Sequence, residues 1–528
     1  MNKIAIYLNR HISGNVFDKD SILEAYSTDR SPLEVKPRFV ALPESTSDVR
    51  KLVRFVNQLA EKKYDLPLAI RGSGLSKSGA DLSSGIVLST ERMNHIRELD
   101  AHDRLVHVQA GMTLGKLNAL LAPHGLILPV AADPNETLGG LISTCPIDKN
   151  SKKYGGIMNY IDRVEVGLSN GDLLQTSRLS RGKLNAKRSE KGLEGKIYDK
   201  LDTLLDKNIE TVLDLPDSSR VGYPALKHIR RNRDKIFDLL PAFFGAEGSL
   251  GVITEIILRL EVIPPVPHRL FASFNTFKSA AEFADFCNKL DPLSVEIFDQ
   301  RIFKIAEDYG KKPDLLTKRF DEGFLVLTSF NDKTRRSRKK VRRAISFLPK
   351  SAYVTPETRS NHTDFDDFEI SLRSFLNESK GERLALLNDF FVPSDSLPAF
   401  LKDLKSLEKS SKRSLELFGC YSTGIFSLRP NFDLKKLDER RAAITLLRDL
   451  NSLLEKHHGF LAGGYPEGRL KSIIVYPELD KKEKDLFSSV KDLFDPNHIL
   501  SPEVKTLYDT RSAIRHLRTS ENRGFVSE

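Results

Sequence analysis

Cysteine is scarce in this sequence, and its few copies are far apart. The 528 residues include only three cysteines, Cys145, Cys287 and Cys420, and no two of them form a C-x-x-C pair. This pattern excludes a disulfide framework, a cysteine zinc site and an iron–sulfur cluster held by a cysteine run of this chain.

Long apolar runs are missing as well. No segment approaches the roughly 18 consecutive apolar residues of a membrane-spanning helix. The N-terminal stretch MNKIAIYLNRH has only a short apolar run between Lys3 and Asn9, which is less than a signal peptide needs. We therefore expect a cytoplasmic protein with no transmembrane segment, and peripheral contact with the inner face of the membrane stays an open alternative.

The overall composition is that of a soluble globular protein. Hydrophobic residues make up 40% of the chain and charged residues 29%, which gives no sign of disorder. A chain of this length exceeds what one hydrophobic core normally holds, so two or three domains are expected.

Basic residues outnumber acidic ones, for a net charge of +10, and they are densest in Lys333–Arg343, KTRRSRKKVRR. Such a run can bind nucleic acid or an anionic membrane. It can equally be the solvated face of a surface helix. Aromatic residues are not interleaved with the charges, as single-strand binding would favour. We therefore prefer the surface helix and expect no nucleic-acid partner.

Local patterns predict the elements of the first half. Apolar residues three or four apart predict a helix over 45–63 with Ser47 as its N-cap. Short apolar runs predict strands on both sides of a glycine-rich stretch at 71–85. The Asn170-Gly171 pair predicts a hairpin turn.

The pattern of predicted elements changes after the PPVP segment at 264–267. Strand-like and helix-like runs alternate from there on, which indicates a second α+β domain. The last residues are polar, and we expect them to form a loosely held tail. The predicted divisions are an extension at 1–36, a first domain at 37–262, a second at 263–505 and the tail at 506–528.

The glycine-rich stretch RGSGLSKSGADLSSG suggests ligand binding. It lacks the lysine of a P-loop and is followed by a strand, where a dinucleotide-binding turn would open a helix. Two alternatives stay open. The backbone N–H groups of Gly72–Ser76, with the Ser73 and Ser76 hydroxyls, can form an anion-binding nest, or the stretch is a plain surface loop.

Several motifs in order resemble the flavin-linked oxidases of the p-cresol methylhydroxylase/vanillyl-alcohol oxidase superfamily. They are RGSGLSKSG, VHVQAGMTLGKLNALLAPHGLILPVAADPNETLGGLIST, KYGGIMNYIDRVEVGLSNGDLL, FFGAEGSLGVITEIILRL and LFDPNHILSP. Later segments, among them FGCYSTGIFSLRPNFDL and HHGFLAGGYPEGRLK, are similar to the D-lactate, glycolate and D-2-hydroxyglutarate dehydrogenase branch.

The resemblance implies an α+β fold with bound FAD. It implies a two-part FAD-binding domain, with a small α/β lobe and a larger mixed-sheet lobe, followed by an α+β cap domain with a ferredoxin-like antiparallel sheet. Relatives with covalent flavin carry histidine where this chain has Leu75, so the resemblance implies non-covalent FAD. The cofactor-binding residues it implies are Arg71, Gly72, Ser73, Gly74, Leu75, Ser76, Pro134, Thr137, Gly139, Gly140, Glu247, Gly248, Val252 and Ile253.

The sequence departs from this family at two places. After Gly139-Gly140, relatives usually show an asparagine and small residues, whereas this chain has Cys145, Pro146, Ile147 and Asp148. Cys145 is interpreted as a small buried hydrophobe or as a reactive thiol beside the flavin. In the second half, the branch's metal ligands correspond to Cys420, Ser427 and Gly464, and its catalytic histidine to Tyr465. Because zinc needs about four N, S or O donors, we expect no metal.

Polar residues near these motifs are the remaining catalytic candidates. Tyr465 would accept a proton if nearby cations lowered its pKa from about 10, and Arg469 or Arg373 would grip a carboxylate. The alternatives are a packed aromatic ring and peripheral charges.

The sequence therefore predicts an FAD-dependent oxidoreductase, a dehydrogenase. It would move hydride from a small hydroxylated substrate, such as a 2-hydroxy acid, to flavin N5 without a metal. The electron acceptor is left open among oxygen, a quinone and a partner protein. The alternative is a catalytically degenerate flavin-binding protein that serves as a binding or scaffold partner.

Overall fold

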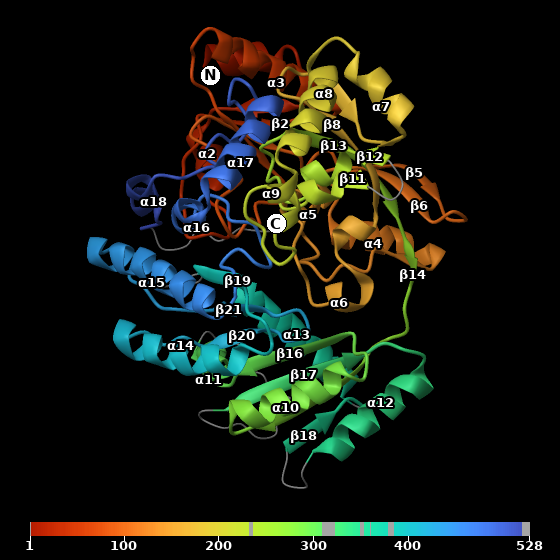
Figure 1. Cartoon of the computed structure of the whole chain (residues 1–528), viewed down its shortest axis with the longest axis vertical. Coiled ribbons are helices and arrows are strands. Elements are labelled where there is room, and N and C mark those ends of the chain that lie inside the picture. The colour runs from red at the N-terminus through yellow and green to blue at the C-terminus, as the bar shows by residue number, and fades with distance from the viewer. Residues whose placement is uncertain are drawn as a thin grey trace.

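The computed structural model of the chain describes residues 2–231, 236–308, 323–348, 353–358, 361–377 and 385–519. Figure 1 shows two stacked halves, with the N-terminal half above and a cap below. Among the described residues there is no helix whose length and hydropathy would let it span a bilayer.

The first lobe is a four-stranded sheet in the order β1-β2-β4-β3. Strand β1 (Asn15–Phe17) runs antiparallel to β2 (Phe39–Leu42). Strands β2 and β3 (Leu68–Arg71) both run parallel to β4 (Ile86–Ser89). The glycine-rich stretch therefore begins at the end of β3 and leads into β4. Two short helices, α1 (Lys3–Asn9) and α2 (Asp20–Ala25), precede and follow β1 in the chain.

The helix expected over 45–63 is α3, Thr46–Glu61, and its apolar stripe is buried. Its N-cap is Ser45 rather than the expected Ser47, because the Ser45 hydroxyl accepts the N–H of Asp48 at 3.2 Å. Either serine satisfies the sequence rule, and the extended backbone of residue 45 decides between them.

The second lobe is an antiparallel five-stranded sheet in the order β5-β6-β13-β8-β9. The predicted hairpin is confirmed, since the Gly171 N–H donates to the Leu168 carbonyl at 2.8 Å between β8 and β9. The main elements are β5 (Ile96–Asp100), β6 (Leu105–Gln109), α4 (Leu114–Leu121), α5 (Leu138–Thr144), α6 (Ser151–Tyr154), β8 (Ile161–Gly167), β9 (Leu173–Gln175), α7 (Arg181–Arg188), α8 (Leu193–Lys207), α9 (Ile209–Asp214) and β13 (Val252–Arg259). The short strands are β7 (Leu126–Ile127), β10 (Arg178–Leu179), β11 (Arg230–Arg231), β12 (Ile236–Asp238) and β14 (Glu261–Val262).

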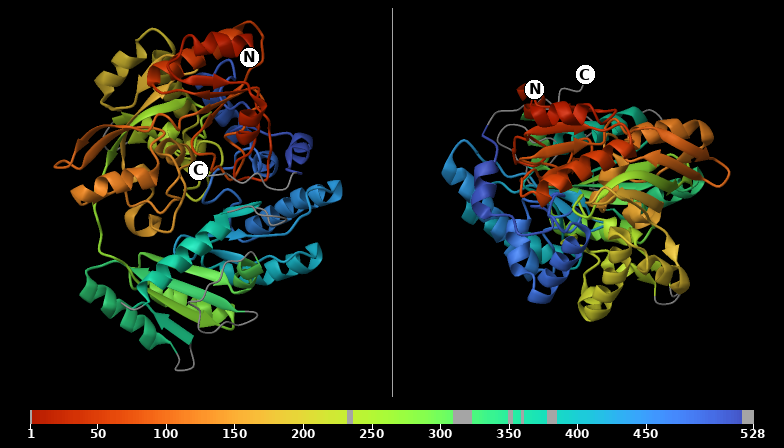
Figure 2. Two further views of the ribbon diagram at one scale, coloured as in Figure 1. Left: turned by 180° about the vertical axis from the view of Figure 1, so that it is seen from behind. Right: turned by 90° about the horizontal axis from the view of Figure 1, so that it is seen from above.

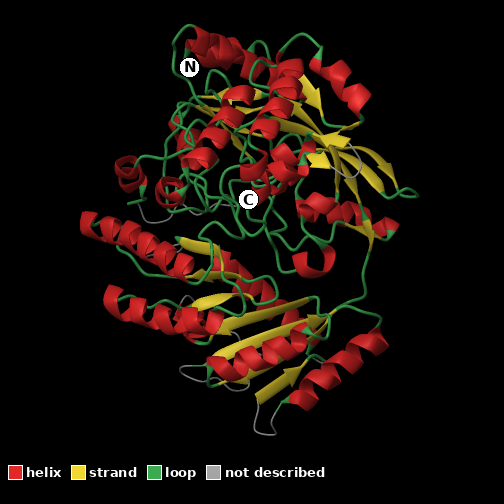
Figure 3. Ribbon diagram, viewed as in Figure 1, coloured by secondary structure: helices red, strands yellow, loops and turns green. Residues whose placement is uncertain are grey.

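The cap is built on a seven-stranded antiparallel sheet in the order β18-β15-β17-β16-β20-β21-β19. Residues of α10, α14 and α15 share one core with one face of the sheet, and residues of α11 and α13 share another with the opposite face (Figure 3). Its elements are β15 (His268–Phe274), α10 (Phe277–Asn288), β16 (Ser294–Asp299), α11 (Arg301–Asp308), β17 (Phe324–Phe330), α12 (Thr334–Phe347), β18 (Tyr353–Pro356), α13 (His362–Asn377), β19 (Leu387–Phe391), α14 (Leu397–Ser411), β20 (Leu417–Cys420), β21 (Ile425–Leu428) and α15 (Leu437–Lys456).

The α+β fold with an antiparallel cap sheet is confirmed. The basic run at 333–343 falls on α12, a surface helix whose inner residues Ser337, Lys340 and Ala344 are buried. The Lys340 ammonium lies 2.7 Å from Asp332 and 5.8 Å from the centre of the Phe330 ring.

After the cap, the chain returns to the N-terminal half. Helix α17 (Lys481–Phe494) buries Leu486, Phe487, Val490 and Phe494 in the core of the second lobe. Leu500 then pairs with Leu68 beside β3. Figure 2 shows these C-terminal helices, in blue, against the N-terminal elements, in red.

The loosely held tail expected at 506–528 is wrong for residues 506–519. Tyr508, Ala513 and Leu517 are buried. Ala513 lies in helix α18 (Thr510–His516), and Leu517, directly after this helix, forms an isolated bridge with Leu33. These apolar residues are sparse among polar ones, so composition alone concealed them. Residues 520–528 lie outside the described part.

Candidate active site

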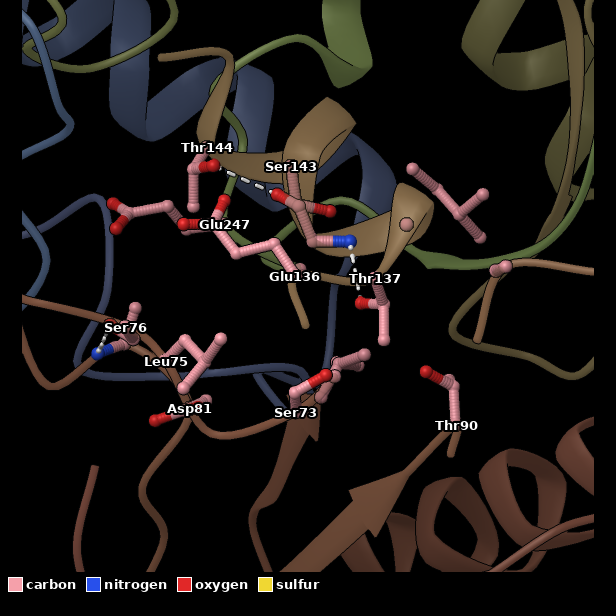
Figure 4. A pocket seen from close by; sticks show the side chains of 18 of the residues that line it. Ser73, Leu75, Ser76, Asp81, Thr90, Glu136, Thr137, Ser143, Thr144 and Glu247 are labelled. Atoms are coloured by element: carbon pink, nitrogen blue, oxygen red, sulfur yellow. Dashed lines mark hydrogen bonds between the residues drawn. The ribbon is translucent and has the colours of Figure 1, made fainter. Parts of the chain in front are cut away.

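A cavity lies where the two lobes and the C-terminal segment meet. Figure 4 shows Ser73, Leu75 and Ser76 on one side and Ser143 and Thr144 on the other. The lining residues are Ile70, Gly72, Ser73, Gly74, Leu75, Ser76, Ala80, Asp81, Thr90, Ala110, Glu136, Thr137, Gly139, Gly140, Ser143, Thr144, Glu247, Gly248, Gly251, Ile253 and Tyr465.

The glycine loop presents a row of free donors. None of the backbone N–H groups of Gly72–Ser76 donates a hydrogen bond to another described residue. Gly74 has a φ of +71°, a left-handed conformation that glycine adopts without strain. The Ser76 hydroxyl accepts the Ala80 N–H at 3.3 Å, and the Ser73 hydroxyl donates to the Asn135 carbonyl. Unpaired N–H groups at a cavity wall are what an anion-binding nest requires.

The opposite wall is held close to the loop by small residues. A Cβ placed on Gly72 would lie 2.1 Å from Oγ1 of Thr137, and one on Gly139 would lie 3.0 Å from the Cβ of Ala110. Thr137 is the N-cap of α5, and its hydroxyl accepts the Gly140 N–H at 3.2 Å. A slot with glycine faces and free N–H donors fits a flat ring system joined to a pyrophosphate, so the residues present fit FAD.

Most of the predicted cofactor residues line this cavity, and three do not. Arg71 is buried behind the loop and donates to the Thr28 carbonyl at 2.9 Å. Val252 packs in the core of the first lobe, and Pro134 is exposed. Sequence reasoning missed several other lining residues, and those with polar side chains are Asp81, Thr90, Glu136, Ser143 and Thr144.

The three catalytic candidates are placed differently. Tyr465 lines the cavity. Arg469 is buried outside the lining, where its Nε donates to Glu503 at 3.0 Å and its Nη1 to the Gly79 carbonyl. Arg373 lies in α13, and its side chain is outside the described part of the structure.

The idea that cations lower the pKa of Tyr465 is wrong. Burial raises this pKa well above its usual 10, and the charges of Glu136 and Glu247 raise it further. The Lys77 ammonium lies 5.6 Å from the centre of the Tyr465 ring, too weak an influence to reverse this. Tyr465 is therefore a neutral hydrogen-bond donor, not a proton acceptor, at neutral pH.

The positions that correspond to metal ligands do not suit a metal. Cys420 is buried, and burial raises its thiol pKa to about 11. The Ser427 hydroxyl accepts the N–H of Asp389 at 3.0 Å. A Cβ on Gly464 would lie 2.6 Å from Cγ2 of Ile425, so no longer side chain fits there. Across the described residues, no group of three or more His, Cys, Asp or Glu side chains is arranged to hold a metal ion.

Cys145 behaves as a buried apolar residue. It ends α5 with a φ of +43°, and its carbonyl accepts Nε of Arg220 at 3.2 Å. Burial raises the thiol pKa to about 11, which disfavours the reactive thiolate.

A buried charge cluster supports the cavity wall at Glu247. The Lys505 ammonium lies 3.2 Å from Glu247 and 2.8 Å from Glu467. The Glu247 carboxylate also accepts the Ser78 hydroxyl at 3.2 Å and the Gly468 N–H at 3.1 Å. These contacts tie the glycine loop to the C-terminal segment.

A second set of charges connects the FAD-binding half to the cap. Lys77 follows the glycine loop, and its ammonium lies 2.9 Å from Asp389 on β19. Lys471 donates to the carbonyls of Asn388 at 2.7 Å and Leu461 at 3.1 Å, and burial lowers its pKa to about 8. Lys77 and Asp389 are far apart in the sequence, so no local pattern indicated their contact.

Comparisons with known proteins agree with this geometry. The family model for the FAD binding domain matches residues 37–177, and the model for the FAD linked oxidases' C-terminal domain matches residues 263–504. The fold and the cavity thus define a two-domain protein with an FAD-binding half and an oxidase-type cap. The chain belongs to the FAD-linked oxidases.

Relatives include a D-2-hydroxyglutarate dehydrogenase of Haemophilus influenzae, 26% identical, with 96% of this chain and 51% of the relative covered. A glycolate oxidase subunit GlcD of Bacillus subtilis is 23% identical, with 95% and 96% covered. The chain spans about half the length of the D-2-hydroxyglutarate dehydrogenases first matched, at 49–51%.

Two solved structures share the fold. An alkyldihydroxyacetonephosphate synthase has a TM-score of 0.64 at 16% identity, with 95% of this chain and 86% of that one covered. A 4-ethylphenol oxidase from Gulosibacter chungangensis has a TM-score of 0.65 at 15% identity, with 94% and 95% covered.

Proposed function

We propose that this chain is an FAD-dependent dehydrogenase that oxidises a small 2-hydroxy acid without a metal. The observation that carries the proposal is the cavity itself, whose lining includes both the glycine loop and the polar residues Glu136 and Tyr465. The names of the dehydrogenase and oxidase relatives favour a hydroxy acid.

In this proposal the chain holds FAD by its backbone. The free N–H groups of Gly72–Ser76 bind the pyrophosphate, and the wall from Thr137 to Gly140 lies along the flat ring. When bound, FAD supplies a two-electron acceptor for the hydrogen on the substrate's hydroxyl-bearing carbon. Leu75 lines the cavity with a side chain that has no nucleophilic atom, so we propose that FAD is held without a covalent bond.

The substrate would bind between the FAD-binding half and the cap. The Lys77 ammonium, paired with Asp389, lies beside the Tyr465 ring, and the neutral Tyr465 hydroxyl donates a hydrogen bond to a substrate oxygen. The surrounding burial strengthens both interactions by excluding water.

Anaerobic spectroscopy tests this function. The purified protein should show a flavin spectrum, and a panel of D- and L-2-hydroxy acids and sugar alcohols should include one that bleaches it. Acid precipitation should release all of the flavin to the supernatant. No bleaching by any of the panel would instead support a flavin-binding protein that has lost catalysis.

Two further experiments test the electron acceptor and the cellular location. Reoxidation of the reduced protein by oxygen, by a soluble quinone or by a cell extract distinguishes the three acceptor classes. We propose a cytoplasmic location. Cell fractionation tests it, and peripheral attachment would place the protein in the membrane fraction and release it at high salt.

A further inference from the structure

Glu136 occupies a fixed position at the cavity. Its backbone N–H donates to the Asp133 carbonyl and its carbonyl accepts the N–H of Leu114, both at 2.9 Å. It directly precedes Thr137, the N-cap of α5. Figure 4 shows Glu136 at the upper wall, next to Thr137, and Tyr465 belongs to the same lining.

The carboxylate of Glu136 has no hydrogen-bond or ion-pair partner among the described residues. Its charged neighbours are already paired, since Lys77 lies 2.9 Å from Asp389 and Arg30 lies 2.7 Å from Asp133. A carboxylate at a cavity wall without a protein partner is available to a ligand. Without such a ligand, a partly buried carboxylate that makes no hydrogen bond lowers the stability of the folded protein.

The other ionisable side chains of the lining differ from Glu136. Glu247 is held by Lys505, Ser78 and Gly468. Asp81 is held less firmly, since its Oδ2 lies 4.0 Å from the guanidinium of Arg71 and its Oδ1 has no hydrogen-bond partner among the described residues. Burial raises the pKa of Asp81 well above its usual range. Tyr465 keeps its proton, because burial and nearby carboxylates raise its pKa.

We propose that Glu136 is the base that accepts the hydroxyl proton of the substrate, a role that rests on the proposed dehydrogenase function. The substrate's Cα–H bond breaks and its hydrogen leaves with the electron pair to the oxidised flavin. The O–H bond breaks, its proton passes to a Glu136 oxygen, and its electron pair forms the C=O bond of a 2-oxo acid. The proton then leaves to solvent when the product departs.

The electrostatics around Glu136 suit this work near neutral pH. Burial raises the pKa of Glu136 to about 7, and Asp133 and Asp389 raise it while Lys77 and Arg30 lower it. A base whose pKa is close to the working pH is largely deprotonated and still has a strong enough affinity for the proton that it must accept. Because only the deprotonated form accepts a proton, the rate should rise as the pH rises through about 7.

The experiment compares Glu136→Gln with wild type in the FAD-loaded protein. Anaerobic stopped-flow reduction by the best hydroxy acid should slow by about 10²–10⁴-fold in Glu136→Gln and lose its rise with pH. FAD content and the visible spectrum should stay unchanged. Glu136→Asp, which keeps a carboxylate, should retain part of the rate and the rise with pH.

A matched control is Asp133→Asn. Asp133 is on the same loop, but it is paired with Arg30 and does not line the cavity. This variant should keep a rate close to wild type. The apparent pKa of its pH–rate profile should fall, because the Asp133 charge that raises the pKa of Glu136 is gone.

Oxalate, an unreactive analogue of a 2-oxo acid, gives a readout that needs no turnover. Its dissociation constant, measured from the flavin spectrum, should rise as the pH passes about 7 in wild type, because ionised Glu136 repels the anion. In Glu136→Gln this rise should vanish.

If Glu136→Gln reduced the flavin at the wild-type rate and with the wild-type pH profile, the proposed role of Glu136 would be overturned. The proposed dehydrogenase function would not be affected. Failure of every hydroxy acid to reduce the wild-type flavin would overturn the function, and the base with it.

Discussion

At the scale of single residues, the shape of the cavity depends on glycines, where a side chain would clash with the opposite wall. Gly72 is the sharpest case, because a Cβ there would lie 2.1 Å from Oγ1 of the N-cap Thr137. The loop is pressed against α5 at this point. Relief of the clash would move either the row of N–H donors or the helix start, and both belong to the proposed FAD site.

Gly72→Ala should therefore weaken FAD binding by at least about tenfold, equivalent to roughly 1.4 kcal/mol. Fluorescence titration of the apoprotein with FAD measures the effect. Gly182→Ala is the matched control, since a Cβ on Gly182 in α7 meets nothing within 4 Å. It should leave FAD affinity unchanged and raise the free energy of unfolding by about 0.5–1 kcal/mol. Equal FAD affinity in both variants would contradict the close contact.

Lys505 shows how one buried charge holds two others. Its ammonium lies between Glu247 and Glu467, and all three side chains are buried. Lys505→Met should lower the free energy of unfolding by about 3–5 kcal/mol, because it leaves two uncompensated buried carboxylates. Urea denaturation measures this, with the exposed Lys36→Met as control. Lys36 pairs with Asp20 at the surface, so its loss should cost no more than about 1 kcal/mol.

Residue-scale signals also explain what the sequence could predict. The glycine stretch and Asn170-Gly171 act through their own backbone conformations, so a strand–loop–strand turn and a hairpin followed from local rules. The contact of Lys77 with Asp389, and of Tyr465 with the cavity, depends on how the cap docks. No local pattern contains that information, and the direction of the Tyr465 pKa was misjudged for this reason.

At the scale of elements, the C-terminal segment is where the sequence was least informative. Beyond residue 505 its apolar residues are few and irregularly spaced, so periodicity gave no signal there. In the structure, α17 completes the core of the second lobe, and α18 brings Leu517 to Leu33 near the start of the chain. The segment therefore joins both halves of the molecule.

A pair of leucines tests whether this segment contributes to stability. Leu517 is 2% exposed and Leu507 is 57% exposed. Leu517→Ala should lower the free energy of unfolding by about 2–5 kcal/mol, the usual cost of a truncated core leucine. Leu507→Ala should change it by no more than about 0.5 kcal/mol. Chemical denaturation of both variants gives the comparison, and equal stabilities would mean that the segment is not packed as described.

At the scale of the whole molecule, the cavity is assembled from distant parts of the chain. Its lining comes from the β3–β4 loop, from α5, from the residues before β13 and from Tyr465 after the cap. A ligand there contacts both lobes and the C-terminal segment at once. Binding is therefore coupled to the folding of the assembled protein rather than to one lobe.

FAD should accordingly raise the unfolding temperature of the apoprotein, and the pyrophosphate should carry much of the effect. At 100 times its dissociation constant, a ligand that binds only the folded state contributes about 2.7 kcal/mol. Riboflavin has the ring but no phosphate, so it leaves the N–H groups of Gly72–Ser76 unpaired and should raise the unfolding temperature much less at equal concentration. ADP, which has the pyrophosphate without the ring, should lie between the two. Thermal unfolding followed by circular dichroism with each ligand measures the order, and equal shifts for FAD and riboflavin would show that the glycine loop does not bind the pyrophosphate.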